Sequence, residues 1–282
     1  MFKSNTVIKQ LNDRVVHVDY FDSFGEMLKY VEQNPHMGQC DKDGTSGWDG
    51  MKNFAEANEL ARSGWHDIRP EVEKLLDNMS EVIADRLELS PAMQWNVAGG
   101  VVDVGRYCGN EPMCMIDFPM EPQERMGKVV KLFIDYGASG GFTGEFIMKR
   151  GIVLLALVDT LQKLGVSVEI YGETAVTSGS TCHTTVTKLH DPTDKLDIDE
   201  LMFTLAHPAM LRRMAFAVRE MSSCSKGISA HAGGTYGSTI HTVYAPTVNA
   251  DIRMERLERQ STQCMENPVE WVMQTISGLN LI

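Results

Sequence analysis

The stretch from Val129 to Glu173 constrains the fold most, because two short apolar runs flank a glycine-rich loop and a longer apolar segment. The runs Val129–Ile134 and Val166–Tyr171 have the length of buried strands, and Phe146–Leu164 has the length of a helix. Two strands joined by a helical crossover pair in parallel within one sheet, with a right-handed connection. The sequence therefore predicts an α/β fold, with a mainly parallel, Rossmann-like sheet flanked by helices.

The residues before this stretch show mainly helical periodicity. Apolar side chains recur at helical spacing in Ser23–Gln33, Met51–Ser63 and Glu71–Leu89. Pro119–Gly127 contains two prolines and is typical of a linker. We therefore predict a helical N-terminal module with short strands over residues 1–120, followed by an α/β domain over residues 121–282.

The composition argues against several classes of partner. The chain of 282 residues has a formal net charge of -12 and a pI of about 5.1, whereas a general nucleic-acid binder needs a basic surface. The longest apolar run, Ile152–Val158, is too short to cross a bilayer. The first ten residues lack the apolar core of a signal peptide. These features predict a cytoplasmic protein that binds neither nucleic acid nor membrane.

The cysteines contain no C-x-x-C pair, so neither a structural zinc site nor a disulfide framework is expected. In a cytoplasmic chain they are expected to be free thiols. They are Cys40, Cys108, Cys114, Cys182, Cys224 and Cys264.

The loop between the first predicted strand and its helix is the candidate functional segment. It reads DYGASGGFTG over residues 135–144, with the aspartate directly after the strand. In open α/β sheets, ligands bind outside the carboxyl ends of parallel strands, where this loop lies. Three functional interpretations stay open beside a structural one, in which the glycines only let the strand turn into the helix.

The first interpretation rests on a resemblance. The order of elements, with Asp135 at the strand end and Ser139 four residues later, resembles a von Willebrand factor A-like domain with a metal-ion-dependent adhesion loop. In that family the aspartate and two hydroxyls, two and four residues further on, help to hold a divalent cation. Gly137 stands in place of the first hydroxyl, so the resemblance implies a degenerate metal site.

The resemblance implies that Asp135 and Ser139 hold Mg²⁺ or Mn²⁺ weakly, with water at the position that lacks a hydroxyl. A threonine from the next loop would complete the site, and Thr174, Thr177 and Thr181 remain alternatives for it. A-like domains in cells generally bind other proteins. The predicted function is accordingly a protein-interaction module rather than an enzyme, with metal assisting the binding of a partner.

The N-terminal half carries a second resemblance. Its tryptophan- and glycine-rich segment and the stretch NVAGGVVDVGRYCGNEPMCMIDF over residues 96–118 look like a family of bacteriophage-encoded proteins. This resemblance implies a location in the host cytoplasm and a phage or host protein as partner. It implies no activity.

The second interpretation is a serine hydrolase. Residues 137–141 fit the G-x-S-x-G nucleophile elbow, with Ser139 as the nucleophile. Asp191, His231 and His241 follow in the chain order that such a triad requires. Because the loop is longer than an elbow needs, we expect no histidine within hydrogen-bonding reach of Ser139.

The third interpretation is a nucleotide or phosphate site. Four glycines at the start of a helix can present backbone N–H groups to an anion. Neither the Walker ending nor the G-x-G-x-x-G spacing is present in residues 135–144, so this interpretation rests on glycine content alone.

Overall fold

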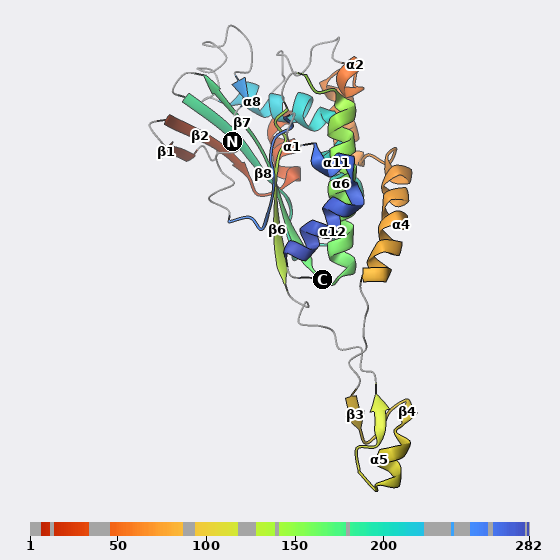
Figure 1. Ribbon diagram of the computed structural model, residues 1–282. Coiled ribbons are helices and arrows are strands. Elements are labelled where there is room, and N and C mark those ends of the chain that lie inside the picture. The colour runs from red at the N-terminus through yellow and green to blue at the C-terminus, as the bar shows by residue number, and fades with distance from the viewer. Residues whose placement is uncertain are drawn as a thin grey trace.

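The computed structural model describes residues 7–11, 14–33, 46–86, 94–117, 128–138, 141–178, 181–222, 238–239, 249–258, 262–279 and 281. Most of these residues build one large sheet with helices packed on it, and residues 94–117 build a second, smaller sheet (Figure 1). The predicted α/β class is confirmed.

The large sheet consists of two parallel halves that run in opposite directions. Strands β6 (Val129–Asp135), β7 (Ser167–Ser178) and β10 (Ile252–Met254) are parallel, with β6 in the middle. Strands β2 (Arg14–Phe21) and β8 (Thr181–His190) are also parallel, and β8 pairs antiparallel with β7. The carboxyl ends of β6 and β7 therefore lie at one end of the sheet, and those of β2 and β8 at the other.

Two short strands extend this sheet. Strand β1 (Val7–Leu11) pairs antiparallel with β2 at one edge, and β9 (Ser238–Thr239) pairs antiparallel with β7. The strand order is β1-β2-β8-β7-β6-β10, with β9 beside β7 outside this path.

Helix α6 (Gly144–Lys163) is the predicted crossover between β6 and β7. The two strands pair in parallel from Val129 opposite Ser167 to Asp135 opposite Glu173, which confirms the predicted unit. The helix is buried on most sides because α4 (Arg69–Arg86), α7 (Ile198–Ala206), α11 (Gln263–Glu266) and α12 (Pro268–Gly278) pack on it. A side chain at Gly151 would overlap Ala206, so this glycine allows the close approach of α6 and α7.

The N-terminal residues belong to the same sheet and core. Strand β2 pairs along its length with β8, and α1 (Phe24–Glu32) and α3 (Phe54–Ser63) pack into the main hydrophobic core. This corrects the predicted division at residue 120, since residues 14–86 do not form a module of their own. The pairing joins segments far apart in the chain, which local periodicity cannot reveal.

Capping residues in the local sequence explain several helix ends. The Ser23 side chain accepts a hydrogen bond from the backbone N–H of Glu26 at the start of α1, and Asp197 caps α7 in the same way. Gly64 ends α3 with a φ of 81°, a conformation that favours glycine. The described helices that accompany the large sheet also include α2 (Ser46–Asp49), the π-helix η2 (Met210–Ala215) and α8 (Phe216–Met221).

The smaller sheet, with its helix, is called the small unit below. It contains β3 (Gln94–Asn96), β4 (Val101–Val102), α5 (Val104–Cys108) and β5 (Met115–Asp117), with strand order β3-β5-β4. Asp103 ties the unit together: its carboxylate accepts hydrogen bonds from the Arg106 backbone N–H and the Trp95 indole, each at 3.1 Å. Figure 1 shows this unit apart from the large sheet.

The two faces of the large sheet bury different side chains. The face toward α6 carries Val130, Leu132 and Ile134 in the main core. The opposite face carries Phe133 in a second, smaller cluster with Tyr171. Figure 1 shows α4, α6, α11 and α12 stacked on one side of the sheet. Within the described part of the chain, no helix is long and apolar enough to span a membrane.

Candidate functional site

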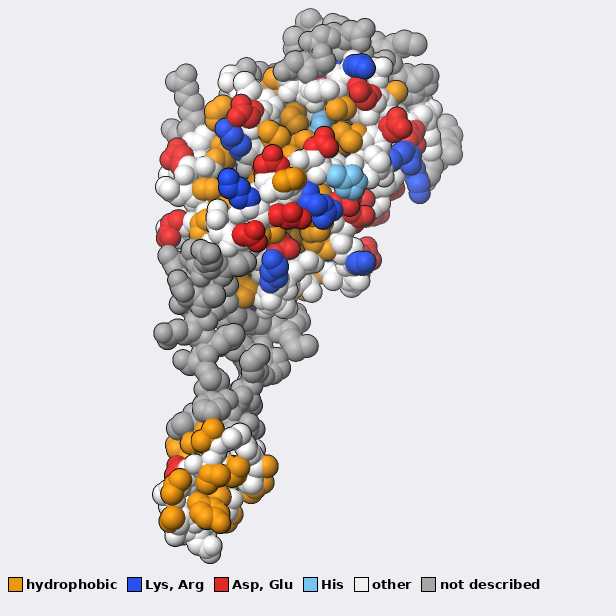
Figure 2. Space-filling model, turned by 90° about the vertical axis from the view of Figure 1, so that its right-hand side faces the viewer, with side chains coloured by type: hydrophobic (Ala, Val, Ile, Leu, Met, Phe, Trp, Pro, Cys, Tyr) orange, Lys and Arg blue, Asp and Glu red, His pale blue; other side chains and the backbone are white. Residues whose placement is uncertain are grey.

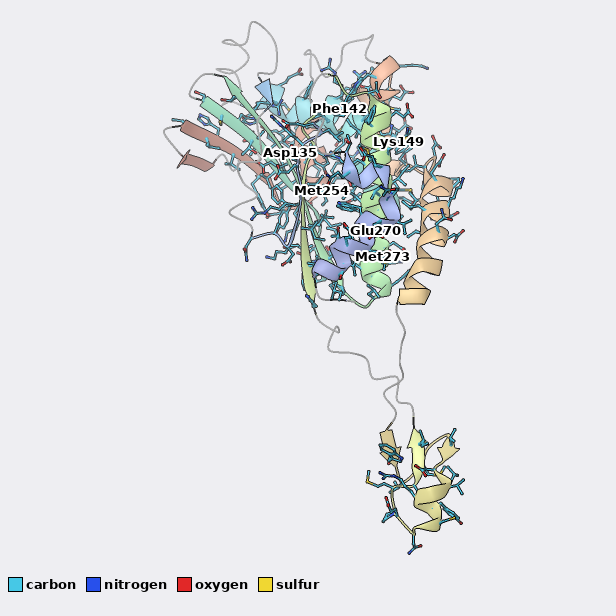
Figure 3. The ribbon with its side chains drawn as sticks, viewed as in Figure 1. Asp135, Phe142, Lys149, Met254, Glu270 and Met273 are labelled. Atoms are coloured by element: carbon cyan, nitrogen blue, oxygen red, sulfur yellow. The ribbon has the colours of Figure 1, made fainter. Side chains whose placement is uncertain are left out.

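Two buried carboxylates lie side by side at the carboxyl end of the central parallel pair. Asp135 ends β6 and is directly opposite Glu173 of β7, and neither side chain is exposed to solvent. Since side chains alternate along a strand, both point to the face of Phe133 and Tyr171, away from α6. Figure 3 shows Asp135 at the sheet, near Met254 of β10. The sequence predicted Asp135 at this place and missed Glu173.

The Asp135 carboxyl has one satisfied and one unsatisfied oxygen. The Gly137 backbone N–H donates to Oδ1 at 2.6 Å, whereas Oδ2 is buried without a hydrogen-bond partner among the described residues. Burial raises the pKa of Asp135 to about 7, and the neighbouring Glu173 and Glu255 carboxylates act in the same direction. The Gly137 N–H and the Arg150 guanidinium oppose this shift. A proton or a cation near Oδ2 would therefore stabilise the site.

Glu173 is held by a hydroxyl from the neighbouring strand. Thr184 of β8 donates from Oγ1 to Glu173 Oε1 at 2.5 Å, and Thr184 is itself buried. Two carboxylates and a hydroxyl supply the hard oxygen atoms that Mg²⁺ and Mn²⁺ prefer. The described residues contain no group of three or more His, Cys, Asp or Glu side chains placed to hold a metal. A cation at this place would therefore have at most two carboxylates among the described residues as charged ligands.

Position 137 leaves no room for a side chain. A Cβ atom at this position would lie 2.8 Å from Asp135 Oδ1 and 3.2 Å from Arg256 Cβ. A serine would therefore push the carboxylate or Arg256 out of place. The backbone N–H of Gly137 contacts Asp135 instead, so the loop binds this carboxylate through its main chain.

The three candidate threonines do not face Asp135. Strand β7 continues to Ser178, beyond the predicted end at Tyr171, so Thr174 and Thr177 lie in a strand and not in a loop. Thr174 points to the opposite face, where Arg219 donates to its hydroxyl at 2.8 Å. Thr177 lies further along β7 than Glu173, the residue opposite Asp135, and donates to the carbonyl oxygen of Thr181 in β8 at 3.1 Å. Ser139 lies outside the described residues.

The hydrolase interpretation depends on residues that the structure mostly does not describe. Ser139, His231 and His241 lie outside the described residues. Asp191 follows β8, at the opposite end of the sheet from Asp135. Its carboxylate accepts hydrogen bonds from Thr193 and Lys188, which hold its pKa well below the usual range. Asp191 therefore has a structural role in a turn.

Gly144, the first residue of α6, allows neighbouring residues to pack closely against the start of the helix. A Cβ atom at Gly144 would overlap the Trp48 carbonyl oxygen and approach Pro208, so both residues cover the first turn of the helix. The Trp48 indole also donates to the Phe142 carbonyl oxygen at 2.9 Å. Figure 3 shows Phe142 near the start of α6. With this helix start covered and Asp135 at the strand end, the geometry does not favour a phosphate at this loop.

The small unit presents a second candidate site, an exposed apolar surface. Six of the nine large, exposed hydrophobic side chains of the described residues belong to it, although it has only 24 residues. Val97, Val104 and Tyr107 are each about two thirds exposed. The full set is Val97, Val101, Val102, Val104, Tyr107 and Met113. Figure 2 shows hydrophobic side chains over most of the visible surface of the unit. Such concentrations commonly mark interaction sites.

The chain belongs to a family whose model is described as a domain of unknown function (DUF7192), and the match covers residues 5–280. The matched range includes the large sheet and the small unit. No curated protein and no solved structure matches the chain.

Sequence reasoning missed Glu173, Thr184 and the apolar surface for different reasons. Glu173 follows an apolar run just as Asp135 does, so the ends of the two runs were a usable signal. Thr184 became visible only through the register of β7 and β8. The valines of residues 97–104 read as ordinary strand and helix residues until the structure placed them at the surface.

Proposed function

We propose that this protein is a non-enzymatic protein-interaction module, and that its small unit docks exposed apolar side chains into a partner protein. The observation that carries the proposal is the concentration of Val97, Val101, Val102, Val104, Tyr107 and Met113 on 24 residues. Burying such side chains releases roughly 25 cal/mol for each Å² of apolar surface removed from water.

The polar groups of the small unit support a protein partner. The Arg106 guanidinium pairs with Glu111 at 3.2 Å and lies 4.2 Å from the centre of the Trp95 ring. Its charge is therefore balanced within the unit, so docking need not strip water from an unpaired cation. Tyr, Trp, Met and Arg are the residues that interfaces favour.

The charge of the chain favours a protein over a nucleic acid or an anionic membrane. The net charge is -12, and Asp103, Glu111 and Asp117 outnumber Arg106 as the charged groups of the small unit. Anionic partners would be repelled. The resemblances point to a phage or host protein in the host cytoplasm, and the described cysteines, Cys108, Cys114, Cys182 and Cys264, are all free.

A divalent cation is the second part of the proposal. Asp135 and Glu173 would hold Mg²⁺ or Mn²⁺, and the cation would neutralise two adjacent buried negative charges. The unpartnered Asp135 Oδ2 supports this role. When bound, the ion would stabilise the end of β6 and β7 and the loop that follows β6.

The docking proposal is tested with a partner first captured from host cells and then purified. Calorimetry compares the wild type with the triple variant Val97→Thr, Val104→Thr, Tyr107→Gln. We expect the triple variant to bind at least about a hundredfold more weakly, since hot-spot truncations typically cost 2 kcal/mol or more. Val129→Thr is the matched control, because Val129 is an exposed valine on the large sheet. Equal affinity of wild type and triple variant would refute the proposal.

The metal proposal is tested by thermal unfolding of the wild type and Asp135→Asn in EDTA, MgCl2 or MnCl2. We expect the cation to raise the melting temperature of the wild type only. Asn keeps the shape of the side chain and the hydrogen bond from Gly137 but removes the charge. A wild-type melting temperature that does not respond to either cation would exclude the metal and leave the docking proposal intact.

A further inference from the structure

A cavity of about 330 Å³ lies where β2 and β8 end, at the opposite end of the sheet from Asp135. Its walls come from residues 22–25 at the start of α1 and residues 188–191 at the end of β8. Asp194, Lys195 and Asp197, which precede α7, and Glu200 and Leu201 of α7 complete them. The carboxyl end of a parallel strand pair is where α/β sheets place ligand sites. The volume is at the small end of the range for such sites, which suits a single side chain or a small metabolite.

The lining of this cavity is acidic. It contains five carboxylates and two lysines. Lys188 is already paired with Asp191 and Glu169, at 2.9 and 3.3 Å. The carboxylates of Asp22, Asp194 and Glu200 make no hydrogen bond or ion pair with any described residue. Lys195 is the other lysine of the lining, so the carboxylates of Asp22, Asp194 and Glu200 still outnumber the remaining positive charge.

His190 gives an independent sign of a ligand. It is nine-tenths buried and lines the cavity, and no hydrogen bond joins its ring to the described residues. A β-bulge directs it there: β8 has one extra residue, so His190 is opposite Ile170 and Lys188 is opposite Tyr171. Ile170 faces the helices, so the bulge turns His190 toward α1 and α7. Burial lowers the pKa of His190, which keeps the imidazole neutral and able to accept a hydrogen bond.

We propose that this cavity binds a guanidinium group, with Asp194 and Glu200 as its carboxylate partners and His190 as a neutral acceptor. A guanidinium presents five N–H donors in a planar fork that matches carboxylate oxygens. Phe24, Leu189 and Leu201 also line the cavity and provide apolar contact for an alkyl stem. An anion would meet the unpaired carboxylates and is excluded.

The guanidinium has two possible sources, a free guanidino compound or an arginine of another protein. The proposal is independent of docking by the small unit, because the cavity is built from residues of the large sheet and its helices. Its test therefore uses different probes and different variants.

Calorimetry of the full chain with agmatine and with N-acetyl-Gly-Arg-Gly-amide tests the proposal. We expect binding of at least one probe, and tighter binding of one of them identifies the source. Asp194→Asn and Glu200→Gln should each weaken binding about tenfold or more, the amount that a lost charge-assisted hydrogen bond costs. Glu145→Gln is the control, since Glu145 is an exposed carboxylate of α6, far from the cavity lining in sequence, that pairs with Lys149.

Two results would overturn the proposal. One is the absence of binding of both probes at millimolar concentration. The other is binding that neither Asp194→Asn nor Glu200→Gln changes. Asp194 lies in an exposed turn and its side chain makes no hydrogen bond with the described residues, so Asp194→Asn remains informative if Glu200→Gln is poorly folded.

Discussion

The large sheet and the helices packed on it are called the body below. The body and the small unit differ in which side chains they bury and which they expose. The body buries charged groups, including Arg150, Arg213 and Arg219, which are among its largest fully buried side chains. The small unit fully buries no side chain between Trp95 and Ile116, and all four of its valines are exposed. The body therefore buries charged side chains, and the small unit exposes apolar side chains to solvent.

The difference follows from size and points to a division of roles. A unit of 24 residues is too small to enclose a core, so its apolar side chains need a partner to remove them from water. The body has enough apolar residues to enclose charges, provided that each charge has partners. We infer that the body is the scaffold and that the small unit is the recognition element.

The largest expected effect comes from removing one charge of a buried ion pair in the body. Arg213 and Asp49 form a fully buried pair, with Nε and Oδ2 2.7 Å apart. Asp49→Asn leaves the arginine charge without its counter-charge, so we expect a loss of about 3–5 kcal/mol in the free energy of unfolding. Urea unfolding measures it. The control is Glu111→Gln in the small unit, an exposed carboxylate that pairs with Arg106 at 3.2 Å, so a change of no more than about 1 kcal/mol is expected.

The second prediction concerns the pH dependence of stability, which depends on the buried Asp135 of the body. Its pKa is raised from 3.8 to about 7 in the folded protein, so the folded state binds more protons than the unfolded state between these pH values. Stability must therefore fall as the pH rises from about 4 to about 7, by up to roughly 4 kcal/mol. Asp135→Asn should lack this loss. Urea unfolding in EDTA at pH 5 and pH 8 measures the difference. An equal change of unfolding free energy with pH in the wild type and Asp135→Asn would contradict a raised pKa of the buried Asp135 carboxyl.

The smallest expected effect comes from the same substitution, valine to threonine, made once in the body and once in the small unit. Val158 is fully buried in α6, so Val158→Thr places a hydroxyl in an apolar core and should cost about 1–3 kcal/mol. Val104 is exposed in the small unit, and Val104→Thr should change stability by no more than about 0.5 kcal/mol. Thermal unfolding of both variants checks the pair. A large loss for Val104→Thr would mean that this valine supports the fold and is not free to bind.

The sequence predicted those parts of the fold in which burial leaves a local pattern. Strand β6, helix α6 and the first half of β7 are continuous apolar segments, and the structure contains all three. The second half of β7 is rich in polar residues, with Thr174 buried beside Arg219, so it did not read as a strand. The pairing of β2 with β8 depends on distant residues and left no local signal.

The candidate site was predictable only in part for the same reason. Asp135 was found because it ends an apolar run, which fixes its place in a parallel sheet. Its neighbours Glu173 and Thr184 are set by strand register, and the turn of His190 toward the cavity is set by a bulge. Neither register nor bulge can be read from one strand alone.

Photo-crosslinking in cells that produce the protein tests the central claim most directly. The photoreactive residue p-benzoylphenylalanine replaces Val104, Tyr107 or, as the control, the exposed Val129 of the body. The account predicts that positions 104 and 107 both crosslink to the same protein and that position 129 does not. Absence of an adduct at positions 104 and 107, or the same adduct in equal yield at position 129, would contradict the claim that the small unit recognises a partner.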